Sequence, residues 1–197
     1  MMDLNTRIEE SKMLANWIGD QVDGLELNAN ERTRVSAALI SVSLGHHASM
    51  LELFGLGRHA SALALLRSMI DCFVRAMWVK GFASDEEIRA FIAGNDPPGT
   101  QKLILQLESE GPIENLSSIL SANQWATICD FNHGGGRMIV RHLTSEEIAP
   151  NFEAEELVEV VVAADAWALV CTCALADLAD DRDLGERVLK RGQALAA

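Results

Sequence analysis

One long apolar segment, residues 31–54, does most to limit the folds open to this chain. Two adjacent apolar stripes run along it at helical spacing. They are Val35, Ala38, Leu39, Val42, His46, Met50 and Leu53, and beside them Ile40, Leu44, His47, Leu51 and Phe54. A helix that is apolar over so much of its surface lies at the centre of a bundle. We therefore expect His46 and His47 to point into the core or toward a partner chain.

The rest of the chain is also predicted to be helical. Helices are expected at residues 5–22, 58–80, 84–93, 98–108, 113–131 in two pieces, 137–142 and 152–179. The signals for their starts include Asn30, the capping box from Ser84 to Glu87, a further cap at Thr144 and Asn151 before the last helix. These patterns predict an all-α, single-domain helical bundle of about six to eight helices. Its core spans residues 30–180, and residues 181–197 form a polar, frayed C-terminal tail.

The overall charge narrows the classes of function. The 197 residues carry a net charge of −13, which disfavours a generic nucleic-acid coat or a protein of anionic membrane surfaces.

The N-terminus lacks the apolar stretch of a signal peptide, and Glu159 and Asp165 interrupt the most apolar segment, which we interpret as a core helix. The four cysteines include no C-x-x-C pair. We expect buried, reduced thiols in a cytoplasmic protein that does not enter membranes.

Charged residues on the apolar face of the segment 58–80 form a first candidate site. Arg67 and Asp71 are four residues apart, so they can pair. They are either a structural ion pair that fixes helix register, or a site where Arg67 meets an anion and Asp71 orients it. His46 and His47 are likewise either core histidines satisfied by hydrogen bonds or contacts to a ligand.

A metal site is not predicted. His46, His47, His133 and Asp71 are the residue types that bind metals in helical bundles. However, adjacent histidines on one helix diverge by about 100°, and the chain has no H-x-x-x-H or E-x-x-H pair to anchor a metal. We therefore expect neither metal nor cofactor.

The segment Asp130–His142 is the strongest candidate for a site. It places Asn132, His133, Arg137, Arg141 and His142 around three consecutive glycines. Arg137 and His142 have R-x4-H spacing, in which an arginine can stabilise phosphate charge and a histidine can transfer protons to and from ribose and leaving oxygens. His133 is either a second proton-transfer group or a histidine that ends a helix before a glycine. Arg141, Asn132 and Arg67 are expected to bind the substrate or anion.

Several stretches resemble a known family. Leu44–His47, Gly57–Ser68 and Arg75–Trp78, together with Asn132–Gly135 and the pair Arg141 and His142, look like uncharacterised bacterial helical proteins related to the HEPN superfamily (higher eukaryote and prokaryote nucleotide-binding). The resemblance covers roughly residues 30–180. It implies an all-α bundle, commonly a homodimer, in toxin–antitoxin or phage-defence systems.

The resemblance also implies an activity. Active HEPN toxins are metal-independent endoribonucleases with an R-x4–6-H motif, which Arg137 and His142 match; the residue after the arginine is usually polar and is Met138 here. The leading hypothesis is thus a HEPN-like ribonuclease or toxin with RNA as substrate and an antitoxin or other protein partner. The alternative is a non-catalytic, dimeric module that binds an anion, a nucleotide or a partner segment. The two-sided apolar helices predict a homodimer in either case.

Overall fold

The computed structural model describes residues 3–28, 30–111 and 122–196, and these residues form nine helices. The one extended pairing among them is an isolated antiparallel bridge between Leu143 and Ile148. The all-α prediction is therefore confirmed. The helices are α1 (Leu4–Val22), α2 (Glu31–Gly55), α3 (His59–Gly81), α4 (Asp85–Ile92), α5 (Thr100–Glu110), α7 (Ala122–His133), α8 (Gly136–Val140), α9 (Ala154–Leu178) and α10 (Arg182–Ala196).

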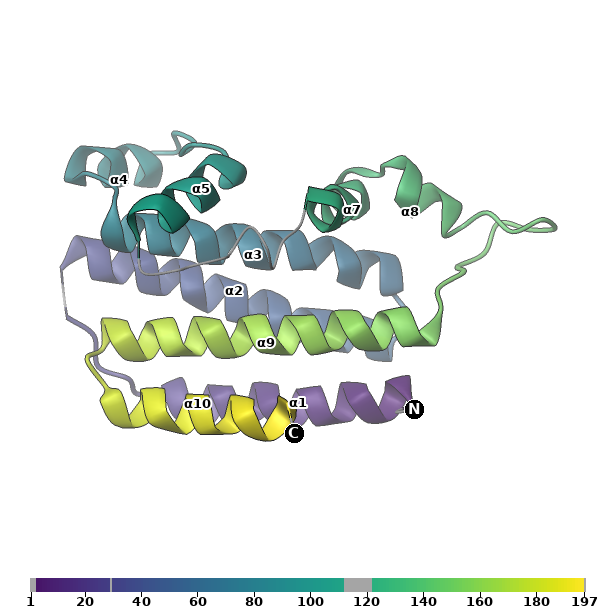
Figure 1. Ribbon diagram of the computed structural model, residues 1–197, viewed down its shortest axis with the longest axis horizontal. Coiled ribbons are helices and arrows are strands. Elements are labelled where there is room, and N and C mark those ends of the chain that lie inside the picture. The colour runs from purple at the N-terminus through teal and green to yellow at the C-terminus, as the bar shows by residue number, and fades with distance from the viewer. Residues whose placement is uncertain (1–2, 29, 112–121, 197) are drawn as a thin grey trace.

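The long helices α1, α2, α3, α9 and α10 lie alongside one another and build the body of the bundle (Figure 1). α9 packs against α1, α2 and α10, and α2 packs along the whole of α3. Two smaller groups, α4 with α5 and α7 with α8, sit beside α3 at opposite ends of the molecule (Figure 1). The core runs between the long helices and includes Leu14, Ile40, Phe73 and Val161, each at most 1% exposed.

Local capping explains where several helices begin. The side chain of Asn30 accepts a hydrogen bond from the Thr33 amide at 2.8 Å and so caps α2. At α4, Ser84 and Glu87 form both hydrogen bonds of a capping box. Both predicted caps are confirmed because their short polar side chains stand directly before an amphipathic segment.

Two other predicted caps are wrong. Thr144 accepts from the Glu147 amide at 2.9 Å, but this turn belongs to the loop closed by the Leu143–Ile148 bridge, and no helix follows it. The N-cap of α9 is Glu153 rather than Asn151, whose amide donates to the Arg141 carbonyl at 2.7 Å. Thr144 therefore caps a loop turn, and the backbone N–H of Asn151 joins the loop to Arg141 before the helix begins.

The predicted frayed tail is also wrong, because the chain continues as α10. Leu184 and Val188 of this helix are at most 1% exposed and pack in the core. Their burial stabilises the helical state of a segment whose composition is polar overall. The predicted helix 113–131 is seen as α7 from residue 122 onward, and its first part lies outside the described residues.

The burial of side chains on α2 and α9 shows which of the predicted apolar stripes pack in the core. On α2 the stripe with Ile40, His47 and Leu51 is buried, whereas Ala38 and Val42 of the other stripe are exposed. By length and composition α9 could cross a membrane, yet half of its most apolar window is buried inside the bundle. It packs as the core helix that the sequence predicts.

Candidate functional site

The three glycines of the predicted site make a tight turn between α7 and α8. Gly134 has a φ of +70°, in the left-handed region that favours glycine at a helix end. The Gly135 amide donates to the Asp130 carbonyl at 2.8 Å, and a side chain at position 135 would collide with Asp130. The Asp130 carboxylate then accepts from the Arg137 amide at 3.1 Å. The run therefore ends one helix and starts the next.

The residues on either side of this turn face solvent. His133 is exposed at the end of α7, and its Nε2 lies 3.4 Å from the exposed Asn132 amide nitrogen. Arg137 is exposed in the first turn of α8. The turn thus holds His133 and Arg137 at the surface rather than directing them into the bundle.

His142 is held differently, against an aromatic cluster. Its ring meets Phe152 edge-on with centroids 5.6 Å apart, and its Nδ1 lies 3.3 Å from the Met138 carbonyl oxygen. His59, at the start of α3, packs edge-on against the same Phe152 ring, also at 5.6 Å. Partial burial lowers the pKa of His59. Phe152 therefore contacts two imidazoles, and the ring centroid of Phe131 lies 6.3 Å from that of Phe152.

Behind Phe152, a pocket of about 370 Å3 opens between α3, α7 and α9. Its volume and its mainly apolar wall are typical of small-molecule sites. The wall comes from ten apolar side chains, namely Leu63, Leu66, Ile70, Ile128, Phe131, Phe152, Leu157, Val160, Ala163 and Trp167.

Four polar side chains complete the lining of this pocket: Thr127, Arg141, Glu156 and Glu159. Arg141 pairs with Glu156 at 2.6 Å, so its charge is already matched by a carboxylate. Glu159 adds a second carboxylate. The pocket lining is consequently net negative, and Arg141 is the one predicted anion-binding residue that contributes to it.

Arg67 and Asp71 form the predicted pair, with Nε 3.2 Å from the carboxylate. Asp71 also accepts from the Thr100 hydroxyl at 2.7 Å, and Arg67 lies 2.8 Å from the Cys129 sulfur and 5.2 Å from the Trp125 ring centroid. This Arg67 cluster ties α3 to α5 and α7. Its guanidinium and carboxylate are already engaged, which favours the structural interpretation.

His47 belongs to a separate buried cluster around Asp165 of α9. The Asp165 carboxylate accepts from Arg7, from the Ser11 hydroxyl at 2.7 Å and, across 2.8 Å, pairs with His47 Nε2. His47 and Asp165 are 1% and 2% exposed. His47 therefore lies in a different cluster from Arg67 and Asp71, and its partner comes from α9. His46 is half-buried, and burial lowers its pKa.

Sequence reasoning missed Asp165 as a partner and missed most of the pocket wall. The available signal was Asp165 itself, because an ionisable residue inside an otherwise apolar helix requires a partner. The pocket residues come from distant segments, and nothing in their spacing groups them. Among the described residues, no three histidine, cysteine, aspartate or glutamate side chains gather as a metal-ligand set.

The comparisons with known proteins give a family without an assigned activity. A model for a family of unknown function, DUF6988, matches residues 40–196. The chain belongs to this family. The matched region includes the whole pocket, His47 and Asp165, whereas Arg7 and Ser11 precede it. No curated protein and no solved structure matches the chain.

Proposed function

We propose that the protein is a non-catalytic helical module that binds a small amphipathic molecule in the pocket between α3, α7 and α9. The pocket itself carries the proposal, since it combines a largely apolar wall with a few polar groups on one chain. The cytoplasmic location expected from the free thiols forms part of the same proposal.

The lining indicates the chemistry of the ligand. Phe131, Phe152 and Trp167 offer aromatic surfaces to an apolar or aromatic body. Because Glu156 neutralises Arg141 and Glu159 remains, a cationic head is favoured over an anionic one. The ligand that we propose is thus an aromatic or aliphatic amine, in place of the anion or nucleotide that the sequence predicted.

The test compares two probes of equal shape and opposite charge. Titration calorimetry with 4-phenylbutylamine and 4-phenylbutyrate should show the amine binding more tightly, by about tenfold, which corresponds to about 1.4 kcal/mol. Equal affinity would remove the charge argument. If neither probe binds, the pocket is rejected as a site for this ligand class.

A matched pair of variants locates the binding. Ala163 lines the pocket, and Ala166 is exposed on the same helix outside it. Ala163→Phe should abolish amine binding by filling the pocket, whereas Ala166→Phe should leave it unchanged. Loss of binding in both variants, with both folded by circular dichroism, would contradict the location.

A second candidate function is the metal-independent RNA cleavage implied by the HEPN resemblance, together with its toxin or phage-defence role and an antitoxin partner. The supporting observation is the setting of His142. In the tautomer whose Nδ1–H donates to the Met138 carbonyl, Nε2 keeps a lone pair that can accept a proton. Arg137, in the exposed first turn of α8, is accessible to phosphate.

RNA cleavage in the presence of EDTA tests this candidate. Cleavage that is lost in Arg137→Ala and His142→Ala, and kept in the control Arg89→Ala on the exposed surface of α4, would establish it. Intact RNA after long incubation with folded wild-type protein would reject it and leave the ligand-binding proposal untouched.

A further inference from the structure

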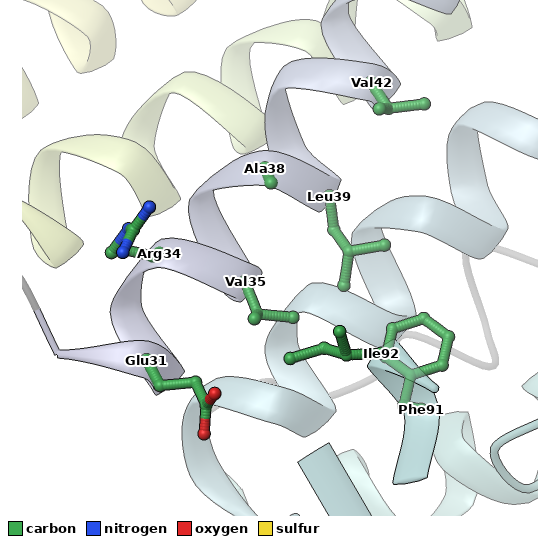
Figure 2. Close-up of a pocket in the computed structure, with 8 residues that line it drawn as sticks. All are labelled: Glu31, Arg34, Val35, Ala38, Leu39, Val42, Phe91 and Ile92. Carbon is green, nitrogen blue, oxygen red and sulfur yellow. The ribbon is translucent and has the colours of Figure 1, made fainter. Parts of the chain in front are cut away.

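The outward face of α2 meets α4 in an open groove of about 620 Å3. Figure 2 shows Val35 and Leu39 of α2 leaning toward Phe91 and Ile92 of α4. Val42 is 50% exposed and Ile92 is 57% exposed. Large apolar side chains gathered in one exposed groove are typical of an interaction surface.

The same face of α2 is free of charge over most of its length. Between Arg34 and Glu52 the helix carries no aspartate, glutamate, lysine or arginine, although the whole chain has a net charge of −13. Five small residues are exposed along it, namely Ala38, Ser41, Gly45, Ala48 and Ser49. Two copies of so acidic a chain repel each other, so an uncharged face is where they can approach. Small side chains also let two helices pack closely.

Two oppositely charged residues, Arg34 and Glu52, flank the uncharged stretch of this face, and Glu31 lies one turn before Arg34. Glu52 follows Arg34 by a whole number of turns of about 3.6 residues, so the two side chains stand on one line of the helix. Arg34 makes no ion pair within residues 3–28, 30–111 and 122–196, and Glu52 lies 3.6 Å from Lys12 while its side chain stays 69% exposed. An antiparallel pairing of two α2 helices would place each Arg34 opposite the Glu52 of the other copy.

The antiparallel pairing also supplies an occupant for the groove. Leu56 directly follows α2 and is 73% exposed. With the two-fold axis midway between Arg34 and Glu52, the Leu56 end of one helix reaches the Glu31 end of the other, where Val35 and Ile92 line the groove. A two-fold contact repeats this arrangement on both sides.

We propose that the protein is a homodimer whose two α2 helices pack antiparallel, each placing its Leu56 end at the α2–α4 groove of the other copy. The interface lies on different helices from the ligand pocket, and either proposal can fail without the other.

Sedimentation equilibrium of the full chain measures the association directly. The wild-type protein should give twice the 21.4 kDa mass of one chain. Val42→Glu should raise the dissociation constant about tenfold or more, because it buries a charge in the contact. Val162→Glu on α9, at a valine with 49% exposure, is the matched control and should leave the constant unchanged. A wild-type chain that stays at 21.4 kDa at its highest soluble concentration would overturn the proposal.

Charge reversal tests the antiparallel register. Arg34→Glu and Glu52→Arg should each weaken the dimer by placing like charges together, and the double variant should restore it. Circular dichroism melting of each variant checks that folding survives the loss of the Lys12–Glu52 contact. A dimer that forms equally well in both single variants, or that the double variant does not restore, would show that the helices do not pair in this way.

Discussion

Two clusters in this molecule use the same chemistry, an arginine and a carboxylate on apolar helix faces, in different surroundings. In the Asp165 cluster, the side chains of Asp165 and Arg7 are 3% and 9% exposed. In the Arg67 cluster, the side chains of Arg67 and Asp71 are 21% and 17% exposed. The first cluster joins α1, α2 and α9 inside the bundle, and the second joins α3, α5 and α7 near its edge.

The two clusters differ in which charged side chains would lose their partner, and in whether water could then reach them, if the central carboxylate were removed. Losing Asp165 would leave buried His47 without its carboxylate partner and Arg7 with Glu10 alone, whereas losing Asp71 would let solvent reach Arg67. The Asp165 cluster also holds α1, which precedes the region matched by the family, to the helices inside that region. The closed cluster is thus a stability element, and the open one lies closer to solvent.

The largest expected contrast is in the accessibility of the cysteines beside the two clusters. Cys171, next to Ser43 on the closed side, is fully buried, and burial raises its pKa to about 12. Cys129, half-buried next to Arg67, should therefore react with iodoacetamide at least about a thousandfold faster, because Cys171 reacts only after opening. Peptide mass spectrometry after timed labelling measures both rates. Similar rates would show that the bundle opens around Cys171 and that the closed cluster is not closed.

Removing the central carboxylate should be the most destabilising substitution. Asp165→Ala is expected to lower the free energy of unfolding by about 3–5 kcal/mol, since it removes the buried carboxylate that Arg7 and His47 share and leaves Arg7 only Glu10, at 3.4 Å. Urea denaturation followed by circular dichroism measures this loss. If the alanine variant does not fold, Asp165→Asn, which preserves shape and removes charge, takes its place. Asp20→Ala, at an exposed position of α1, is the control and should have little effect.

The corresponding change in the open cluster should cost less. Asp71→Ala removes the Arg67 pair and the Thr100 hydrogen bond, and we expect a loss of about 1–2 kcal/mol because water can solvate Arg67. The same denaturation measurement applies. A loss as large as that of Asp165→Ala would mean that exposure does not separate the two clusters.

These two clusters also show how far sequence reasoning reaches. The Arg67–Asp71 pair follows from spacing on one helix, so the four-residue rule predicts it. The Asp165 pairing joins residues more than a hundred positions apart, and periodicity gives only the face on which each residue lies. His47 was predicted to face inward, correctly, but its partner depends on how α9 is placed against α2.

The C-terminal helix and the pocket illustrate the same limit. α10 has a polar composition, and its helical state depends on the packing of Leu184 and Val188 when α10 lies against α9. The glycine turn, in contrast, follows local rules, since Gly134 ends a helix in the left-handed conformation as the pattern predicted. Several local features were predictable, although the caps at Thr144 and Asn151 were not, and the assembly of distant faces was not predictable.

The smallest predicted effect is a pH dependence of stability that comes from half-buried His59. Burial lowers the pKa of His59 below its usual value of 6.5, so the unfolded chain binds a proton more readily than the folded one. Stability should therefore fall as the pH drops through 6.5. Denaturation at pH values about one unit above and below 6.5 should show a smaller loss for His59→Gln than for the wild type. If His59→Gln keeps the full pH dependence, the edge-on packing of His59 against Phe152 does not penalise its protonation, and the loss comes from other groups, among them half-buried His46, whose pKa burial also lowers.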